Sequence, residues 1–299
     1  MRSFSTVLAF ASLAVVCGQN IILTNDDGWA VAQIRAEYTA LTAAGFDVVL
    51  SAPAENKSGT GSSTTTPGTV TSACEYNTCA VGSPAEGSNS TNTRLNYVNG
   101  FPVDAVKYGI QTLAPKFFGG KPDFVVSGSN IGNNLGTSTV GISGTVGAAS
   151  EAALLGIPSI AFSGDSGSQV SYTTLSQTTS SSTLSANLYS SLVVSFSQVL
   201  LASGAPILPP GISLNVNFPS ATKCTTPSAF KYVLTRIAAD KSATDVTTCG
   251  TNHLPAESTV ISEGCFATVS VFNASTKADV GAVTQAIVLS KLSSILTCP

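Results

Sequence analysis

The chain has 299 residues, of which 43% are hydrophobic and only 10% are charged, with a formal net charge of −3 at pH 7. This length suffices for one large hydrophobic core, or for a core with an appendage. The acidic balance excludes the basic surface that a nucleic-acid polymer requires, and no polybasic patch marks a membrane-binding surface.

The first eighteen residues have the composition of a secretory signal peptide. Arg2 precedes an apolar stretch over residues 7–16, and small residues follow it. The stretch is too short to cross a bilayer, and no later segment offers about 18 uninterrupted apolar residues. We therefore predict a signal peptide over residues 1–18, a secreted mature protein and no membrane span. A buried N-terminal strand or helix is the alternative.

Strands and helices alternate along the rest of the chain. Runs of β-branched apolar residues predict strands that are buried on both faces, and apolar residues at helical spacing predict helices. The predicted strands are residues 20–24, 46–53, 123–128, 158–164, 212–218 and 265–272. The predicted helices are residues 30–45, 104–113, 143–156, 184–202 and 279–296. Residues 54–100 and 166–182 are predicted as loops, and residues 240–263 have little pattern.

This alternation predicts an α/β fold with a Rossmann-like, three-layer core, a mostly parallel sheet and a C-terminal hairpin and helix extension. We assign residues 19–240 to the core and residues 241–299 to a C-terminal excursion, strand and helix. In open sheets of this kind, sites form in the loops that leave the carboxyl ends of the strands.

Seven cysteines are present, and one of them, Cys17, belongs to the signal region. The even number that remains in an exported chain predicts three disulfides and leaves their connectivity open. The nearest pairing joins Cys74 to Cys79, Cys224 to Cys249, and Cys265 to Cys298. The alternative is that these cysteines bind a metal ion, but the chain has no CxxC pair. Sequons at Asn56, Asn89 and Asn273 are candidate glycosylation sites.

Two adjacent acids, Asp26 and Asp27, end the first predicted strand. Two carboxylates about 4 Å apart repel by roughly 4 kcal/mol at an effective dielectric of about 20. A divalent cation with oxygen ligands, such as Mg²⁺, Mn²⁺ or Ca²⁺, would relieve this repulsion, whereas Zn²⁺ fits such ligands less well. An ordinary turn is an equal alternative for this stretch alone, because Asn, Asp and Gly are favoured in turns.

Later loops favour the metal site. Ser58 follows the second predicted strand, and Asn130 follows the third. The next helix begins at Ser143, where free amides and the helix dipole favour an anion, although an ordinary N-cap serine is the alternative. A cation with oxygen ligands next to an anion-binding site is typical of enzymes that hydrolyse phosphate esters.

Five motifs carry a resemblance to a known family. They are ILTNDDG, NKSGTGSS, PDFVVSGSNIGNNLG, SGTVGAASEAALLGIPSIAFS and LNVNFP, in this order over residues 20–219. In order and spacing they resemble the SurE family of metal-dependent phosphatases, which often act on nucleoside monophosphates. The resemblance implies an α/β core and homodimers or tetramers whose C-terminal elements pack on the core or on a partner subunit.

The resemblance also implies roles for individual residues. It implies that Asp26 and Asp27 are catalytic and that the metal ligands are Asp26, Asp27, Ser58 and Asn130. It implies phosphate contacts from Asn25, Ser143, Gly144 and Thr145, with Gly28 needed for the turn. The chain departs from many members at Trp29, Ala30, Thr137, Ser138 and Ile142, and these departures bear on substrate preference.

We therefore expect a secreted, divalent-metal-dependent phosphomonoesterase of the nucleotidase or acid phosphatase type, with Mg²⁺ or Mn²⁺ favoured over Ca²⁺. The main alternative is a non-catalytic secreted binding protein on the same scaffold. A serine hydrolase is suggested by SGDSGS at residues 163–168. It is disfavoured because the one histidine, His253, lies in the poorly patterned excursion and no G-x-S-x-G motif exists. A dinucleotide-binding Rossmann protein is disfavoured because no G-x-G-x-x-G follows the first strand.

Overall fold

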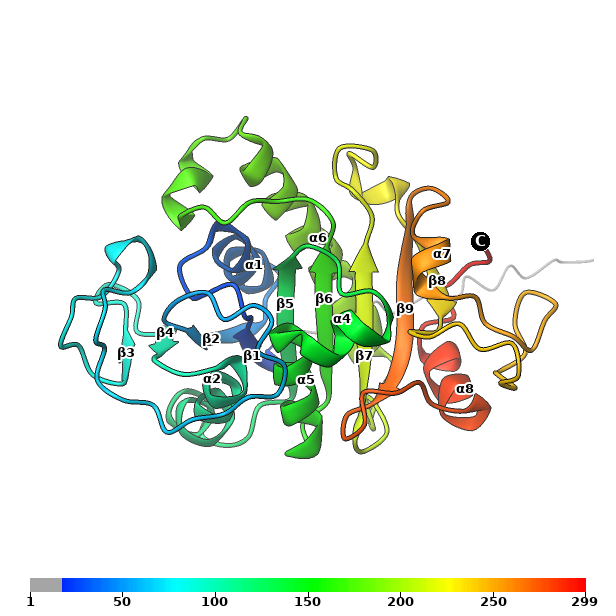
Figure 1. Cartoon of the computed structure of the whole chain (residues 1–299), viewed down its shortest axis with the longest axis horizontal. Coiled ribbons are helices and arrows are strands. Elements are labelled where there is room, and N and C mark those ends of the chain that lie inside the picture. The colour runs from blue at the N-terminus through cyan, green and yellow to red at the C-terminus, as the bar shows by residue number, and fades with distance from the viewer. Residues whose placement is uncertain (1–17) are drawn as a thin grey trace, which may run out of the picture.

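The computed structural model describes residues 18–299, so nearly all of the predicted signal peptide, and Cys17 with it, lies outside the described residues (Figure 1). A nine-stranded sheet crosses the molecule in the order β3-β4-β2-β1-β5-β6-β7-β9-β8. The strands are β1 (Asn20–Thr24), β2 (Asp47–Pro53), β3 (Glu86–Ser88), β4 (Leu95–Val98), β5 (Phe124–Ile131), β6 (Ser159–Gly164), β7 (Ile212–Phe218), β8 (Lys231–Thr235) and β9 (Phe266–Asn273).

Helices cover both faces of this sheet (Figure 1). They are α1 (Ala32–Ala43), α2 (Pro102–Tyr108), α3 (Ala114–Phe118), α4 (Gly136–Ile142), α5 (Gly144–Leu154), α6 (Ser181–Ala202), α7 (Glu257–Val260) and α8 (Ala282–Lys291). A π-helical segment, Gly109–Leu113, joins α2 to α3. The predicted helix over residues 104–113 therefore covers most of α2 and the π-helical segment, and the helical path continues into α3.

The alternation of side chains along β1 shows how the three layers form. Ile21 and Leu23 point into a cluster with residues of α1 and α6, whereas Ile22 points into a second cluster with residues of α2 and α5. Because neighbouring residues of a strand face opposite sides, a continuous apolar run is buried by helices on both faces. The predicted α/β fold is confirmed.

Most strand pairs are parallel, as predicted. The parallel pairs join β1 to β2 and β5, β2 to β4, β5 to β6, β6 to β7, and β8 to β9. The antiparallel pairs are β3 with β4 and β7 with β9. The segment over residues 241–299 therefore contributes β9 to the main sheet, between β7 and β8, in addition to α8.

Short elements were missing from the sequence-based assignment. The predicted loop over residues 54–100 contains β3 and β4, and β8 was not predicted. β3 and β4 have three and four residues, too few for a periodic pattern to separate them from a loop. Helix α6 is apolar and long enough for a membrane span by length and composition alone, but Phe196 and Leu200 on it are buried in the core against the sheet.

The three predicted disulfides are present, and only one of them follows the nearest-neighbour pairing, which the sequence had left open. Cys74 pairs with Cys79, but Cys224 pairs with Cys265, and Cys249 pairs with Cys298. The parallel pairing of β8 with β9 brings the segments that precede both strands together, and Cys224 and Cys265 lie in those segments. The C-terminal segment runs along β8, where Leu296 pairs with Tyr232, and this brings Cys298 to the excursion. Nearest-neighbour pairing ignores such contacts between distant segments.

Candidate active site

The candidate site lies at the carboxyl ends of β1 and β5. These strands are parallel neighbours, so the residues that follow β1 and those at the end of β5 share one edge of the sheet. Asp26 and Asp27 follow β1, and Asn130 lies near the end of β5. Since neighbouring strands are about 4.8 Å apart, these side chains meet although they are about a hundred residues apart in the sequence.

The carboxylate of Asp26 faces the beginning of α5. The amide of Thr145 donates to its Oδ2 at 3.1 Å, and the hydroxyl of Thr145 donates to its Oδ1 at 2.7 Å. Gly144 lies so close that a Cβ there would be 2.8 Å from the Cβ of Asp26. Burial raises the pKa of Asp26, while the hydrogen bonds from Thr145 oppose this shift. The beginning of α5 therefore binds the carboxylate of Asp26, an acidic group of the protein itself.

Ser143 is an N-cap residue. Its hydroxyl oxygen accepts a hydrogen bond from the amide of Val146 at 3.1 Å, and its own amide donates to the carbonyl of Thr139 at 2.9 Å. The N-cap alternative thus describes the local structure. Because the amide of Thr145 is bonded to Asp26, the phosphate contacts implied for Ser143, Gly144 and Thr145 stay a prediction.

Asp27 is held by two other segments. The amide of Ile131 donates to its Oδ2 at 2.9 Å, and Nε2 of Gln169 donates to its Oδ1 at 2.5 Å. Burial and then the charge of Asp26 raise the pKa of Asp27 well above the ordinary range of an aspartic acid. The ionised pair is therefore costly unless a positive charge lies beside it.

The donor set fits a divalent cation with oxygen ligands. Asp26 is 2% exposed and Asp27 is 1% exposed, and the ion pairs of residues 18–299 include neither carboxylate. In the same range, no three His, Cys, Asp or Glu side chains converge as a metal-binding group. Any further ligands beside the two acids would then be neutral oxygens, which Mg²⁺, Mn²⁺ and Ca²⁺ accept.

Asn130 and Ser58 are the predicted neutral ligands. Nδ2 of Asn130 donates to the carbonyl of Gly132 at 2.6 Å, and its Oδ1 lies 3.3 Å from the hydroxyl of Thr145, which also contacts Asp26. Ser58 is exposed on the loop after β2. The amide of Lys57, its neighbour, donates to the carbonyl of Asp26 at 2.7 Å. The structure thus brings Asn130 next to Asp26, and it anchors the Ser58 loop to the same residue through the backbone.

The segment that contains the acids is also a turn. Oδ1 of Asn25 accepts a hydrogen bond from the amide of Gly28 at 3.2 Å, and its Nδ2 donates to the carbonyl of Gly28 at 3.0 Å. Gly28 has a φ of +114°, which strongly favours glycine. The turn that the sequence offered as the alternative to a metal site is therefore present, and it contains the acid pair that a metal site would use.

Two residues near the site were missed by the sequence analysis. Gln169 lies in the predicted loop over residues 166–182, and Glu75 lies in the loop-rich segment over residues 54–100. The amide of Ala30, three residues after Asp27, donates to Oε1 of Glu75 at 2.6 Å. Neither residue belongs to a local motif, so no signal in the sequence marked them.

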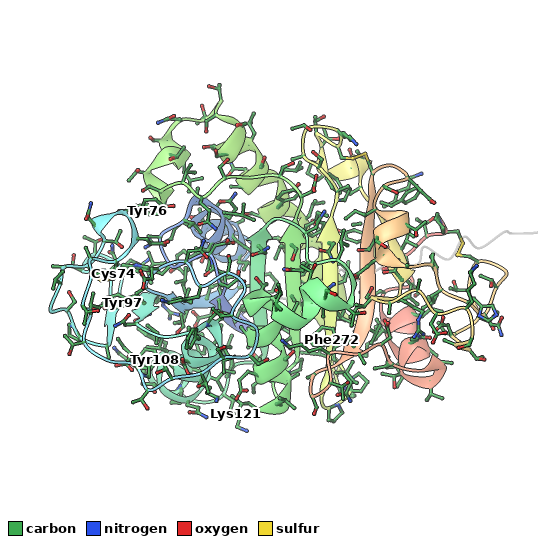
Figure 2. All side chains as sticks on the ribbon, viewed as in Figure 1. Cys74, Tyr76, Tyr97, Tyr108, Lys121 and Phe272 are labelled. Carbon is green, nitrogen blue, oxygen red and sulfur yellow. A yellow bond between two sulfur atoms is a disulfide. The ribbon has the colours of Figure 1, made fainter. Side chains whose placement is uncertain are left out.

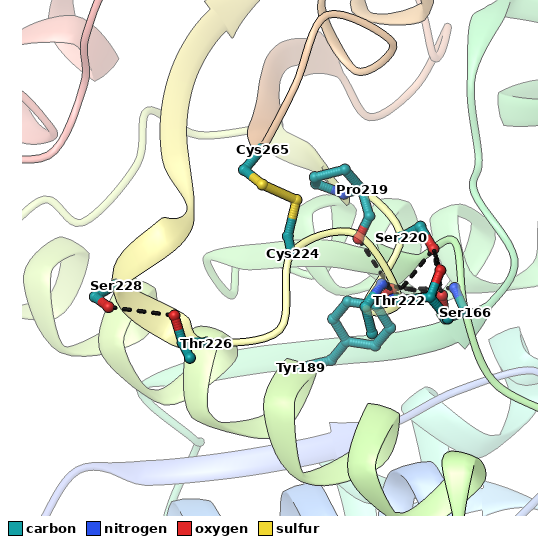
Figure 3. Close-up of a disulfide and its surroundings, with 10 residues drawn as sticks. Ser166, Tyr189, Pro219, Ser220, Thr222, Cys224, Thr226, Ser228 and Cys265 are labelled. Atoms are coloured by element: carbon teal, nitrogen blue, oxygen red, sulfur yellow. Dashed lines mark hydrogen bonds between the residues drawn. A yellow bond between two sulfur atoms is a disulfide. The ribbon is translucent and has the colours of Figure 1, made fainter.

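Within residues 18–299, the SGDSGS motif does not form the catalytic triad that the serine-hydrolase alternative requires. The hydroxyl oxygen of Ser166, in the SGDSGS motif, accepts a hydrogen bond from the amide of Ala221 at 3.0 Å and lies 3.0 Å from the hydroxyl oxygen of Ser220 (Figure 3). Nδ1 of His253 lies 2.8 Å from the carbonyl oxygen of Ala243, in the excursion. Ser166 therefore has no imidazole base, which a serine triad requires.

Comparisons with known proteins bear on this geometry. A family model described as survival protein SurE matches residues 21–244. An acid phosphatase of Yarrowia lipolytica is 38% identical over 237 residues, which are 75% of this chain and 64% of that protein. A 5′-nucleotidase SurE of Desulfitobacterium hafniense is 42% identical over 157 residues, which are 51% of this chain and 54% of that protein.

A solved structure is similar over most of the chain. The crystal structure of the SurE protein from Aquifex aeolicus superposes with a TM-score of 0.60 at 26% identity, covering 85% of this chain and 93% of that chain. The matches to the acid phosphatase and the nucleotidase span less than two thirds of those proteins' own lengths. The family match covers most of this chain and agrees with the five motifs and the α/β sheet, so the chain belongs to the SurE family.

Proposed function

We propose that this protein is a secreted, divalent-metal-dependent phosphomonoesterase that hydrolyses phosphate monoesters, including nucleoside monophosphates. The observation that carries the proposal is the buried pair Asp26 and Asp27 at the carboxyl end of β1, beside the beginning of α5. The names of the relatives, acid phosphatase and 5′-nucleotidase, support the same reaction class.

The metal proposal rests on the donor set. Asp26 and Asp27 would anchor the cation, and Asn130 and Ser58 would complete its ligands. Mg²⁺ or Mn²⁺ suits these oxygens best, and Ca²⁺ is the alternative. When bound, a divalent cation polarises a phosphoryl oxygen and acidifies water.

The chain's own residues would orient the reacting groups. Thr145 holds both oxygens of Asp26, while Gln169 and the amide of Ile131 hold both oxygens of Asp27. Each carboxylate is thus fixed in direction before a substrate arrives, which lowers the entropic cost of assembling the site. We propose that Asn25, Gly28 and residues 143–145 form the phosphate-binding region. We also propose that the protein assembles as a homodimer or a tetramer.

Secretion is supported by the three disulfides, since such bonds persist in oxidising compartments.

Asn56, a sequon residue next to the site, accepts a hydrogen bond on Oδ1 from the amide of Ser58 at 2.8 Å. A glycan there would crowd Ser58, so we propose that Asn56 is unmodified in active protein. Peptide mapping that finds a glycan on Asn56 of active protein would contradict this.

Phosphate release tests the proposal directly. The assay uses p-nitrophenyl phosphate, glycerol 2-phosphate and a panel of nucleoside monophosphates, with and without a chelator and with Mg²⁺, Mn²⁺ or Ca²⁺ added back. The substitution Asp26→Asn should lower kcat by about 100-fold or more while the circular dichroism spectrum is unchanged. The matched control Asp240→Asn changes an exposed acid in the excursion and should have no effect.

Two outcomes would overturn the mechanism: full turnover in the presence of chelator, or an Asp26→Asn variant as active as the wild type. No turnover of any ester by the metal-supplemented wild type would favour the non-catalytic binding protein instead.

A further inference from the structure

A short loop closed by the Cys74–Cys79 disulfide lies against the segment that follows Asp27. The amide of Ala30 donates to Oε1 of Glu75 at 2.6 Å, and the indole Nε1 of Trp29 donates to the hydroxyl oxygen of Thr78 at 3.0 Å. Both contacts join the loop over residues 74–79 to the residues just after the acid pair. This loop therefore borders the candidate active site, although it begins more than forty residues further along the chain.

The loop is also fixed to the end of β2 and to its own disulfide. The amide of Glu75 donates to the carbonyl of Ala54, the residue after β2, at 3.1 Å. The amide of Cys74 donates to the carbonyl of Cys79 at 3.0 Å. The loop is thus held by contacts with the segments that follow β1 and β2, and it is closed by the Cys74–Cys79 disulfide. These constraints fix its position relative to the site.

Glu75 covers the backbone beside the acids. A Cβ on Gly28 would lie 2.2 Å from Oε2 of Glu75, so the carboxyl group occupies the space over the residue after Asp27. Within residues 18–299, Glu75 does not converge with Asp26 and Asp27 into a metal-binding group of three acids. Glu75 instead lies over Gly28 and joins the loop to the segment that follows Asp27.

Tyr76, the next residue, is presented on the tip of this loop. Its side chain is 39% exposed, and its backbone has a φ of 55° and a ψ of 25°, in the left-handed region that few large residues adopt. Its neighbour Glu75 contacts the amide of Ala30 and lies over Gly28, so Tyr76 follows directly on a residue that lies against the segment after Asp27. Burial, and then the charges of Glu75 and Asp27, raise the pKa of the Tyr76 phenol. Figure 2 shows Tyr76 above Cys74, on the left side of the molecule.

We propose that Tyr76 is a specificity-determining residue whose ring contacts an aromatic leaving group, such as a nucleobase or an aryl ring, of the phosphate ester bound at Asp26 and Asp27. The proposal rests on the proposed phosphomonoesterase activity. An exposed ring at the rim of a polar site is suited to stacking, which tolerates different bases because each has a π face. The acidic neighbours Glu75 and Asp27 disfavour an additional anionic group at this position.

The test compares three substrates: a nucleoside 5′-monophosphate, p-nitrophenyl phosphate and glycerol 2-phosphate, which has no ring. In Tyr76→Ala, kcat/KM for the two aromatic esters should fall about tenfold, mainly through KM, and stay within about twofold for glycerol 2-phosphate. Tyr76→Phe is the matched control. It keeps the ring, so it should match the wild type on all three esters.

A second variant tests the part played by the loop. Replacing both Cys74 and Cys79 by serine should lower the preference for aromatic esters in the same direction, because the ring is no longer held at the rim. A uniform loss on all three esters in Tyr76→Ala, or no loss on any, overturns the assignment of Tyr76. Absence of hydrolysis of every ester by the wild type overturns the proposed activity and this inference with it.

Discussion

Thr145 donates two hydrogen bonds to the carboxylate of Asp26, one from its amide to Oδ2 and one from its hydroxyl to Oδ1. The acid at the end of β1 is thereby fixed to the first turn of α5, where the helix dipole favours negative charge. These contacts offset part of the cost of burying the carboxylate. The contacts between Thr145 and Asp26 join the acid pair to α5, whose beginning the sequence predicted as an anion site.

We expect Thr145→Val to lower kcat by roughly 10- to 100-fold, because a hydrogen bond to a charged group contributes about 1.5–3 kcal/mol. Valine keeps the shape of threonine and leaves the amide contact in place. Thr145→Ser, which keeps a hydroxyl, should retain most of the activity. Steady-state kinetics with p-nitrophenyl phosphate would measure both, and a fully active valine variant would show that the hydroxyl contact is dispensable.

Gly28→Ala should destabilise the protein by about 1–3 kcal/mol and lower its activity. An alanine is strained at the φ of +114°, and its Cβ would collide with the carboxyl group of Glu75. Adding Glu75→Ala removes the collision but not the backbone strain, so the double variant should recover only part of the lost stability. Urea denaturation measures these differences; full recovery in the double variant would show that the backbone strain is negligible.

The buried acid Glu37 should make the protein more stable at acidic than at neutral pH. It is fully buried, its Oε2 accepts a hydrogen bond from the amide of Ser129 at 2.8 Å, and its Oε1 has no partner among the described residues. Burial raises its pKa from 4.5 to about 7. Between these values the folded protein keeps a proton that the unfolded chain releases, so the free energy of unfolding falls as the pH rises.

Glu37→Gln isolates this effect, because glutamine keeps the shape and does not titrate. At pH 4.5 the variant and the wild type should have similar free energies of unfolding; at pH 7.5 the variant should be more stable by up to about 3 kcal/mol. Urea denaturation at both pH values measures the difference. A difference between variant and wild type that does not change with pH would contradict the raised pKa.

The Cys249–Cys298 disulfide should contribute to stability and not to catalysis. It joins the excursion to the C-terminal segment at the β8 end of the sheet, with β5, β6, β7 and β9 between β8 and β1. Replacing both cysteines by serine should cost about 2–4 kcal/mol and lower the melting temperature by several degrees. Because the site is elsewhere, kcat/KM at 25 °C should equal that of the wild type. A fall in kcat/KM without a change in melting temperature would show a link to the site.

The sequence determined the local features of this protein. Buried strands such as β1 and β5 follow from β-branched apolar runs, and the beginning of α5 follows from Ser143 as its cap. The position of Asp26 and Asp27 after β1 follows from chain order alone. These features depend on residues within a few positions of one another, so composition and spacing reveal them.

The tertiary structure decided which distant residues meet. The pairing of Cys224 with Cys265 depends on β8 lying beside β9, and β8 carries no clear pattern in the sequence. Gln169 reaches Asp27, and Glu75 reaches the segment after it, from loops whose paths are set by contacts with residues 30–32 and 54. Such contacts depend on the packing of whole elements, and for that reason the sequence specified the acids while the fold alone selected the residues that hold and surround them.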